Sequence, residues 1–198
     1  MKHQSNRRIS LRHTADFICF SALTVEDRKI LTSLGYTTSA FPNTVYSIDC
    51  SSLNHVWHGI GIRNINNGVE FIDFTNMDSP CTLHKKGVSV VYSGKKKSSH
   101  CCLFSTFLDY LAYICLSRMD YEMYIEDCDY IILNDFNNLG YFLVESEDYD
   151  NINMFLPNTW AGKTLAATIM DRNPTAKNWS YKYSIYPDLR SCLYYQNT

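Results

Sequence analysis

Apolar and polar positions follow two different patterns along the chain. In the first half, short apolar runs at 56–62 and 69–74 are separated by a polar segment that ends in Asn66-Asn67-Gly68, which predicts a β-hairpin. A third apolar run at 87–92 leads into a loop of serine, glycine and lysine at 93–99. This half of the chain is therefore expected to be rich in β-hairpins.

A short helix is predicted before the first of these runs. Thr24 and Asp27 have the spacing of a capping box, an apolar helical face follows them, and Gly35 stands where a glycine commonly ends a helix.

From residue 100 the pattern changes to an alternation of buried strands and helices. Such alternation is typical of an α/β fold with a mostly parallel sheet and helices on both faces. In sheets of this kind the ligand crevice lies beyond the carboxyl ends of the strands. The predicted strands are 101–104, 130–133, 152–156 and 181–185, and the predicted helices are 107–115, 137–147 and 162–170. We therefore expect an N-terminal extension with one short helix (1–45), a β-rich segment (46–98) and an α/β core (99–198).

Composition adds limits to this picture. The chain has 198 residues, 45% hydrophobic and 19% charged, which fits a globular protein and excludes disorder, collagen and coiled coil. Its eight cysteines are scattered and are expected to be reduced core residues. No run is long enough to predict a membrane span. Basic residues before the apolar stretch 17–23 loosely mimic a signal peptide, but the flanking acids argue against one, so we expect a cytoplasmic protein.

Three segments resemble the core blocks of a Toprim domain, the fold shared by DnaG-type primases, topoisomerases and some nucleases. They are residues 102–111, 130–134 and 155–162. The segment from Gly59 to Glu70 resembles the β-rich part that precedes this core in Toprim-like proteins of mobile elements in Bacteroides-type bacteria. The resemblance covers about residues 50 to 192 and implies a Toprim-like parallel sheet preceded by β-hairpins.

The acidic positions of the resembled family are occupied differently here. The family carries a glutamate, a proposed general acid/base, at the end of the first block, and an Asp-x-Asp that holds Mg²⁺ in the third. The matching residues are Ser105 for the glutamate, and Pro157, Asn158 and Thr159 for the Asp-x-Asp. Because Mg²⁺ normally needs one or two carboxylates, we expect no metal or other cofactor.

A few polar residues of the family pattern remain. Asp109 follows Ser105 by one helical turn, Asn134 ends the second block, and Asp188 lies in a stretch that resembles the family's C-terminal Lys-Asp-Leu-Asn. The main hypothesis is a catalytically degenerate Toprim-like protein, a binding or accessory factor in mobile-element DNA metabolism. Its partner would be nucleic acid, single-stranded or duplex, or a mobile-element protein. The alternative is an active Mg²⁺-dependent nucleotidyl-transfer or phosphodiester-cleaving enzyme with relocated acids, Asp109, Asp135 and Asp188.

Charge is unevenly distributed. The net charge of −2 combines +5 over residues 1–108, −10 over 109–150 and +3 over 151–198. Bases that could neutralise phosphates, with Tyr92, Phe104 and Trp160 as stacking partners, would guide a single strand. The other interpretation is a solvated lysine loop that protects an edge strand. The candidate nucleic-acid-binding residues are Arg63, Lys85, Lys86, Lys95, Lys96 and Lys97.

Other motifs give weaker hypotheses. Residues 161–164 resemble the end of a P-loop, but the first glycine would fall on Pro157. His55 and His58 have a zinc-ligand spacing without further ligands, and Ser105 lacks the glycines of a hydrolase elbow. The 15 tyrosines suggest a structural or oligomeric protein as a third hypothesis. The sequence does not predict the oligomeric state.

Overall fold

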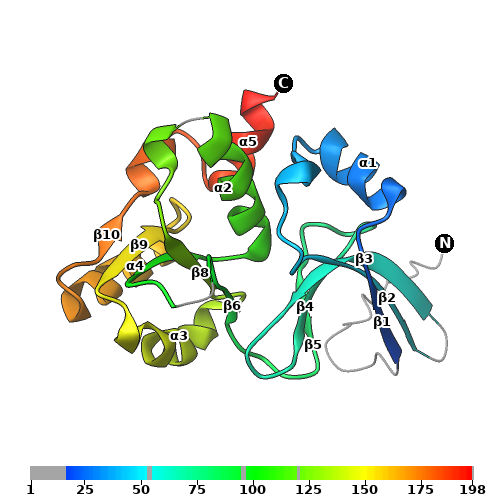
Figure 1. Ribbon diagram of the computed structural model, residues 1–198, viewed down its shortest axis with the longest axis horizontal. Helices are drawn as coiled ribbons and strands as arrows, with labels where there is room; N and C mark the ends of the chain where they lie inside the picture. Colours follow the sequence, from blue (N-terminus) through cyan, green and yellow to red (C-terminus); the bar gives the residue numbers. More distant parts are fainter. Residues whose placement is uncertain (1–16, 53–54, 95–96, 120, 198) are drawn as a thin grey trace, which may run out of the picture.

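The computed structural model describes residues 17–52, 55–94, 97–119 and 121–197. They form two five-stranded sheets that lie side by side, one antiparallel and one mostly parallel with helices on both faces (Figure 1). Over the described residues, no helix combines the length and apolar character needed to cross a membrane. The structure thus confirms the predicted fold class, an α/β sheet preceded by β-hairpins.

The first sheet, sheet A, is a meander of five antiparallel strands. The predicted hairpin is confirmed, since its two strands pair from Gly59 opposite Asp73 to Arg63 opposite Val69. Three further strands were not predicted, among them the edge strand formed by the apolar stretch that loosely mimics a signal peptide. The strands are β1 (Phe17–Ser21), β2 (Tyr46–Ser52), β3 (His55–Arg63), β4 (Val69–Asp73) and β5 (Cys81–Leu83).

The predicted short helix is α1 (Val25–Ser33), which lies over β2 and β3 (Figure 1). Thr24 and Asp27 form the capping box, and Gly35 takes the left-handed conformation with a φ of 90°. Because only glycine adopts this φ without strain, the helix ends where the sequence predicts.

The second sheet, sheet B, has the strand order β10-β9-β7-β8-β6. Four strands are parallel, and β6 pairs with β8 in the antiparallel direction. The third apolar run of the sequence is therefore an edge strand of sheet B. The strands are β6 (Ser89–Val91), β7 (His100–Phe104), β8 (Cys128–Ile132), β9 (Asn151–Phe155) and β10 (Lys177–Asn178).

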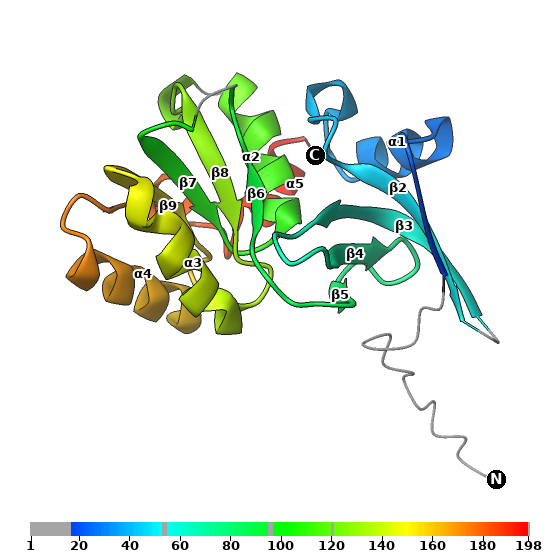
Figure 2. The same cartoon turned by 60° about the horizontal axis from the view of Figure 1, so that its bottom comes forward.

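Alternate residues of β7 face two separate cores. Cys102 and Phe104 pack with α2 (Phe107–Met119) and α5 (Leu189–Gln196) on one face, and Cys101 and Leu103 pack with α3 (Leu139–Glu145) and α4 (Trp160–Arg172) on the other. Figure 2 shows α3 and α4 together on one side of the sheet. This two-sided burial explains why β7 consists of an unbroken apolar run.

Two predictions about aromatic residues change with the structure. Phe104 is fully buried and stacks on Phe155 at 5.5 Å between ring centroids, so its predicted role in guiding a single strand is wrong. Tyr110, Tyr113 and Tyr183 are also buried, so core packing accounts for part of the high tyrosine content.

The predicted strand at 181–185 is wrong. Ser180–Tyr183 form a 3₁₀ helix, and the last strand of the sheet is the two-residue β10. The cause is Asn158, whose side-chain amide donates to the carbonyls of Ser180, Tyr183 and Tyr186 at 3.4, 3.0 and 2.9 Å. Three carbonyls converge on one amide only where the backbone curls, and an extended strand would separate them.

Candidate functional site

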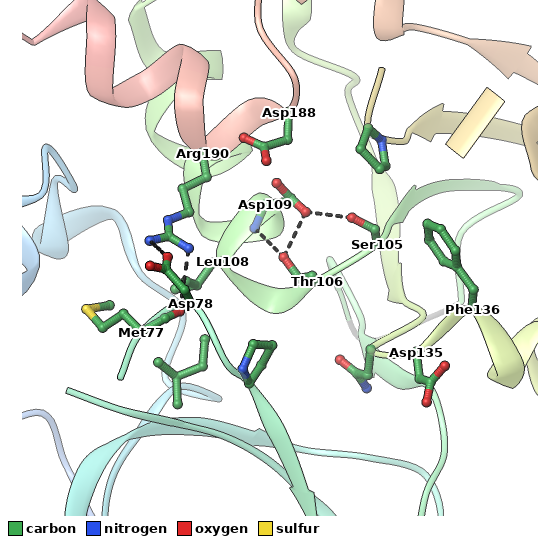
Figure 3. A pocket seen from close by; sticks show the side chains of 14 residues that line it. Met77, Asp78, Ser105, Thr106, Leu108, Asp109, Asp135, Phe136, Asp188 and Arg190 are labelled. Carbon is green, nitrogen blue, oxygen red and sulfur yellow. Dashed lines mark hydrogen bonds and ion pairs between the residues drawn. The ribbon is translucent and has the colours of Figure 1, made fainter. Parts of the chain in front are cut away.

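A cleft of about 340 Å³ opens beyond the carboxyl ends of β7 and β8 and beside Pro157, two residues after β9 (Figure 3). Its floor includes Ser105, Asn134 and Pro157, which follow these strands. Ile72 at the end of sheet A and Arg190 of α5 contribute to the walls. The cleft therefore lies where the parallel sheet predicts a ligand crevice, and sheet A forms part of it.

Asp109 is the most buried acid of the cleft, with 6% of its surface exposed. Its Oδ2 accepts hydrogen bonds from Ser105 Oγ at 2.6 Å and from Thr106 Oγ1 at 2.7 Å. Thr106 Oγ1 also accepts from the Asp109 N–H at 3.1 Å, which caps the start of α2. Burial raises the pKa of Asp109 and the charge of Asp188 adds to the rise, whereas the two hydroxyls oppose it.

The carboxylate of Asp188 lies at the start of α5. It accepts from the Ser191 N–H at 2.7 Å and so caps α5. Figure 3 shows it on the same side of the cleft as Asp109. The sequence singles out both residues, and although they are 79 positions apart, the charge of Asp188 acts on the Asp109 carboxylate in the folded protein.

The other two acids of the cleft are in ion pairs. Asp135 Oδ2 lies 3.1 Å from Lys86 Nζ, and the N–H of Asn137, with Lys86, holds the pKa of Asp135 below its ordinary value. Asp78 Oδ1 lies 2.9 Å from Arg190 at the opposite side (Figure 3). All four carboxylates of the cleft therefore have partners within the chain.

Asn134 joins the edge strand to the rest of sheet B. Its Nδ2 donates to Gly87 O and to Ser89 Oγ, both at 3.0 Å, and its backbone is left-handed with a φ of 65°. Its Oδ1 is buried and has no hydrogen-bond partner among the residues that the structure describes.

The residues of the third block serve mainly to build local structure. Thr159 Oγ1 accepts from the Gly162 N–H at 3.2 Å and caps α4, which begins at Trp160, two residues before Gly162, near which the sequence predicts its start. Asn158 holds the 3₁₀ turn described above, and Pro157 lines the cleft. Of these three residues, only Pro157 faces the candidate site.

The three acids of the alternative hypothesis, Asp109, Asp135 and Asp188, all line this cleft. Among the described residues, however, no three histidine, cysteine, aspartate or glutamate side chains lie together in a way that would hold a metal ion.

The basic candidates do not form one surface. β6 runs antiparallel to β8, so Lys86, which precedes β6, lies at the end of the strands where the cleft opens. Lys97 precedes β7 and lies at the opposite end of the strands, where it pairs with Asp148 at 3.0 Å. Lys85 is next to Lys86, with its carbonyl held by Asn64. Arg63 stacks on the Phe20 ring in sheet A, 4.0 Å from its centroid. Lys95 and Lys96 lie outside the described residues.

Several cleft residues escaped the sequence analysis. Arg190 follows Asp188 by two positions, so the C-terminal resemblance was a signal for it, whereas Asp78, Met77 and Phe136 have no motif. Their place depends on how sheet A and the turn after β8 meet.

Comparisons with known proteins agree with this architecture. No protein-family model and no curated protein matches the chain. Among solved structures, the crystal structure of the primase fragment of the bacteriophage T7 primase-helicase protein is similar, with a TM-score of 0.50 and 12% sequence identity. The match covers 91% of this chain and 70% of that one. At this identity the likeness concerns the fold alone, and it shows that the chain has a primase-like α/β fold.

Proposed function

We propose that the protein is a Toprim-like binding factor in mobile-element DNA metabolism that does not perform the metal-dependent chemistry of that family. One observation carries the proposal: each carboxylate of the cleft is already engaged by a helix cap, a hydroxyl or an ion pair. Ser105 and Pro157, at two family acid positions, add no charge to the cleft.

Nucleic acid is the partner that the fold and the rim of the cleft favour. Phe136 follows β8 and Trp160 follows soon after β9, and these strands flank β7 on either side. The two side chains are 36% and 81% exposed. Exposed aromatic rings offer stacking surfaces to the bases of a single strand. Lys86 and Arg190 would contact phosphates by exchanging their ion pairs with Asp135 and Asp78, while Asp109 and Asp188 keep phosphates out of the deeper part.

Such a mixed surface implies weak binding with a shallow dependence on salt. We expect dissociation constants within the nonspecific range of about 10⁻⁴ to 10⁻⁶ M, with single strands preferred over duplex. Fluorescence anisotropy with labelled single-stranded and duplex DNA at several salt concentrations measures both quantities.

A matched pair of variants locates the contact. Lys86→Ala and Lys97→Ala each remove one lysine from an ion pair of similar length, and the two pairs lie at opposite ends of the strands of sheet B. We expect weaker binding and a smaller salt slope only for Lys86→Ala. The reverse result would place the nucleic acid at the lysine loop. Absence of binding to either form of DNA would contradict the nucleic-acid proposal and favour a mobile-element protein as partner.

A second candidate is the active Mg²⁺-dependent enzyme, which is favoured by the shared location of Asp109, Asp135 and Asp188 in one cleft. Calorimetric titration with Mg²⁺ or Mn²⁺ separates the two proposals. We expect no millimolar or tighter binding and no priming, nicking or relaxation activity. Metal binding lost in Asp188→Asn, or turnover abolished by Asp109→Asn, would overturn the binding-factor proposal.

A further inference from the structure

A histidine bridges two aspartates where α1 rests on sheet A. His58 of β3 places Nε2 at 2.7 Å from Asp27 Oδ1 of α1, and Nδ1 at 2.8 Å from Asp49 Oδ1 of β2. A neutral imidazole has only one N–H, so its other nitrogen would turn a lone pair toward a carboxylate oxygen. Both contacts are favourable together only when the ring carries both protons.

The two aspartates differ in their access to water. The side chain of Asp27 is 0% exposed, whereas that of Asp49 is 60% exposed. The other oxygen of Asp27, Oδ2, accepts from the Thr24 N–H at 2.8 Å, so this carboxylate is also part of the cap of α1. His58 is the only base in an ion pair with Asp27 among the described residues. A buried carboxylate depends strongly on such a partner, because removing one member leaves an uncompensated charge.

We propose that the Asp27–His58–Asp49 bridge is a proton-operated latch that holds α1 on sheet A. With the ring doubly protonated, it ties α1, β2 and β3 together. When it loses a proton, Asp49 can turn to water, so the remaining N–H stays with the buried Asp27. The Asp27 carboxylate then keeps its hydrogen bonds from the ring and from Thr24 but loses its compensating charge.

The neighbours of His58 support this behaviour. Burial by itself would lower the pKa of His58, but hydrogen bonds to Asp49 and Asp27 and the charges of both raise it above its ordinary value of 6.5. The Phe74 side chain also packs against the ring, with centroids 5.6 Å apart. The nearby Asp73 pairs with Gly59, and alternation along the strand puts its side chain on the other face of the sheet.

The pH range in which the latch is closed follows from the directions in which folding shifts the pKa values of Asp27 and His58. Burial would raise the pKa of Asp27, but hydrogen bonds from Thr24 and His58 bring it below 3.8. The contribution of His58 is complete below pH 6.5 and is lost as pH rises through its higher folded-state pKa. That of Asp27 is complete above pH 3.8 and is lost as pH falls through its lower folded-state pKa. The latch is therefore closed between pH 3.8 and 6.5 and opens as pH rises through the folded-state pKa of His58, which lies above 6.5.

Opening of the latch would affect the cleft through the residues that follow α1 in the chain. Leu34 and Tyr36 line a second hollow of about 380 Å³, which shares Asp188 and Arg190 with the cleft. The Tyr36 hydroxyl donates to Leu108 O at 3.4 Å, one residue before Asp109. Release of α1 from sheet A would thus make Leu34 and Tyr36, which line the second hollow next to the candidate site, more mobile.

Ring NMR of the intact protein tests the protonation directly. We expect a His58 pKa above 6.5 and both N–H protons present at pH 6. Asp49→Asn should lower this pKa while Asp27 stays bridged. A His58 pKa at or below 6.5 would overturn the proposal.

Hydrogen exchange tests the mechanical part. As pH rises through the His58 pKa, protection of the α1 amides, corrected for intrinsic exchange and divided by that of α2, should fall about tenfold for each pKa unit by which folding raises the pKa. In the double variant Asp27→Asn/His58→Gln, whose bridge is uncharged, the ratio should not change with pH. A wild-type ratio that stays constant, or a double variant with the same pH dependence, would refute the latch. The wild-type His58 pKa and the wild-type exchange ratio need no variant, so they test the latch even if the double variant does not fold.

Discussion

The hydroxyl of Ser105 donates a 2.6 Å hydrogen bond to Asp109 Oδ2, from the end of strand β7 to the first turn of helix α2. At the position where the resembled family carries its glutamate, this chain thus has a neutral group that holds another carboxylate. That carboxylate is almost completely buried, and Thr106 holds the same oxygen. The hydroxyls therefore stabilise a negative charge that the surroundings disfavour.

Ser105→Ala is expected to destabilise the protein in a pH-dependent manner. A hydrogen bond to a charged group contributes about 1.5–3 kcal/mol, and a neutral one about 1 kcal/mol. Since burial raises the pKa of Asp109, protonated Asp109 is more populated in the folded protein at low pH, and the loss should be larger at pH 8 than at pH 4. Urea denaturation at both values measures it. Ser117→Ala, which changes a similarly buried serine within α2, should show no such difference.

Glu70 of sheet A should make the protein less stable as pH rises. Burial raises its pKa to about 7, although Asn64 Nδ2 and Thr82 Oγ1 donate to its carboxylate at 2.9 and 2.8 Å. A carboxyl with a raised folded-state pKa loses stability between its unfolded value and the folded one, here from pH 4.5 to about 7. The difference of about 2.5 units corresponds to about 3 kcal/mol.

Glu70→Gln tests this expectation because glutamine keeps the shape and can accept from Asn64 while donating to Thr82. The variant should gain stability relative to the wild type as pH rises from 5 to 8, as measured by denaturant unfolding. Glu26→Gln, at an exposed site of α1, provides the control. A stability difference between Glu70→Gln and the wild type that does not change with pH would contradict the raised pKa.

The stability of the protein should depend on the backbone preference of the residue that replaces Asn134. Both Asn134→Gly and Asn134→Ala remove the hydrogen bonds to Gly87 and Ser89, but only alanine has a Cβ that strains the left-handed φ of 65°. That conformation costs a residue with a Cβ about 1–2 kcal/mol. We expect thermal unfolding to rank the wild type above the glycine variant and the glycine variant above the alanine variant. An alanine variant as stable as the glycine variant would show that the strain is absent.

Much of the cleft was predictable because it depends on local order and on the rule for parallel strands. Ser105, Asn134 and Pro157 follow three apolar runs, so a parallel sheet must bring them to one edge. Asp109 is four residues after Ser105, one helical turn away. Arg190 and Asp78 were not predictable in the same way, because their ion pair forms only when α5 and the turn after β4 meet.

The missed strands have a related cause. β2 contains four serine or aspartate residues among its seven, so its propensity is low, and its pairing with β1 and β3 supplies the stabilisation. At 181–185 the local pattern resembled a strand, but Asn158, more than 20 residues away, imposes a turn. Strand pairing in the first case and a distant side-chain amide in the second thus overrode the local preference of the sequence.

Two helical glycines, Gly140 of α3 and Gly162 of α4, should respond in opposite ways to alanine. A Cβ on Gly162 would lie 2.1 Å from the Pro157 carbonyl oxygen, a backbone atom, so the start of α4 must move away from the end of β9. We expect Gly162→Ala to lower the free energy of unfolding by about 1–3 kcal/mol, as overpacked core sites do. A Cβ on Gly140, within α3, would meet nothing within 4 Å, so Gly140→Ala should stabilise the protein by about 0.5–1 kcal/mol through helix propensity. Urea denaturation of the two variants decides the matter, and equal effects would show that the close approach of Pro157 and Gly162 does not constrain the end of β9.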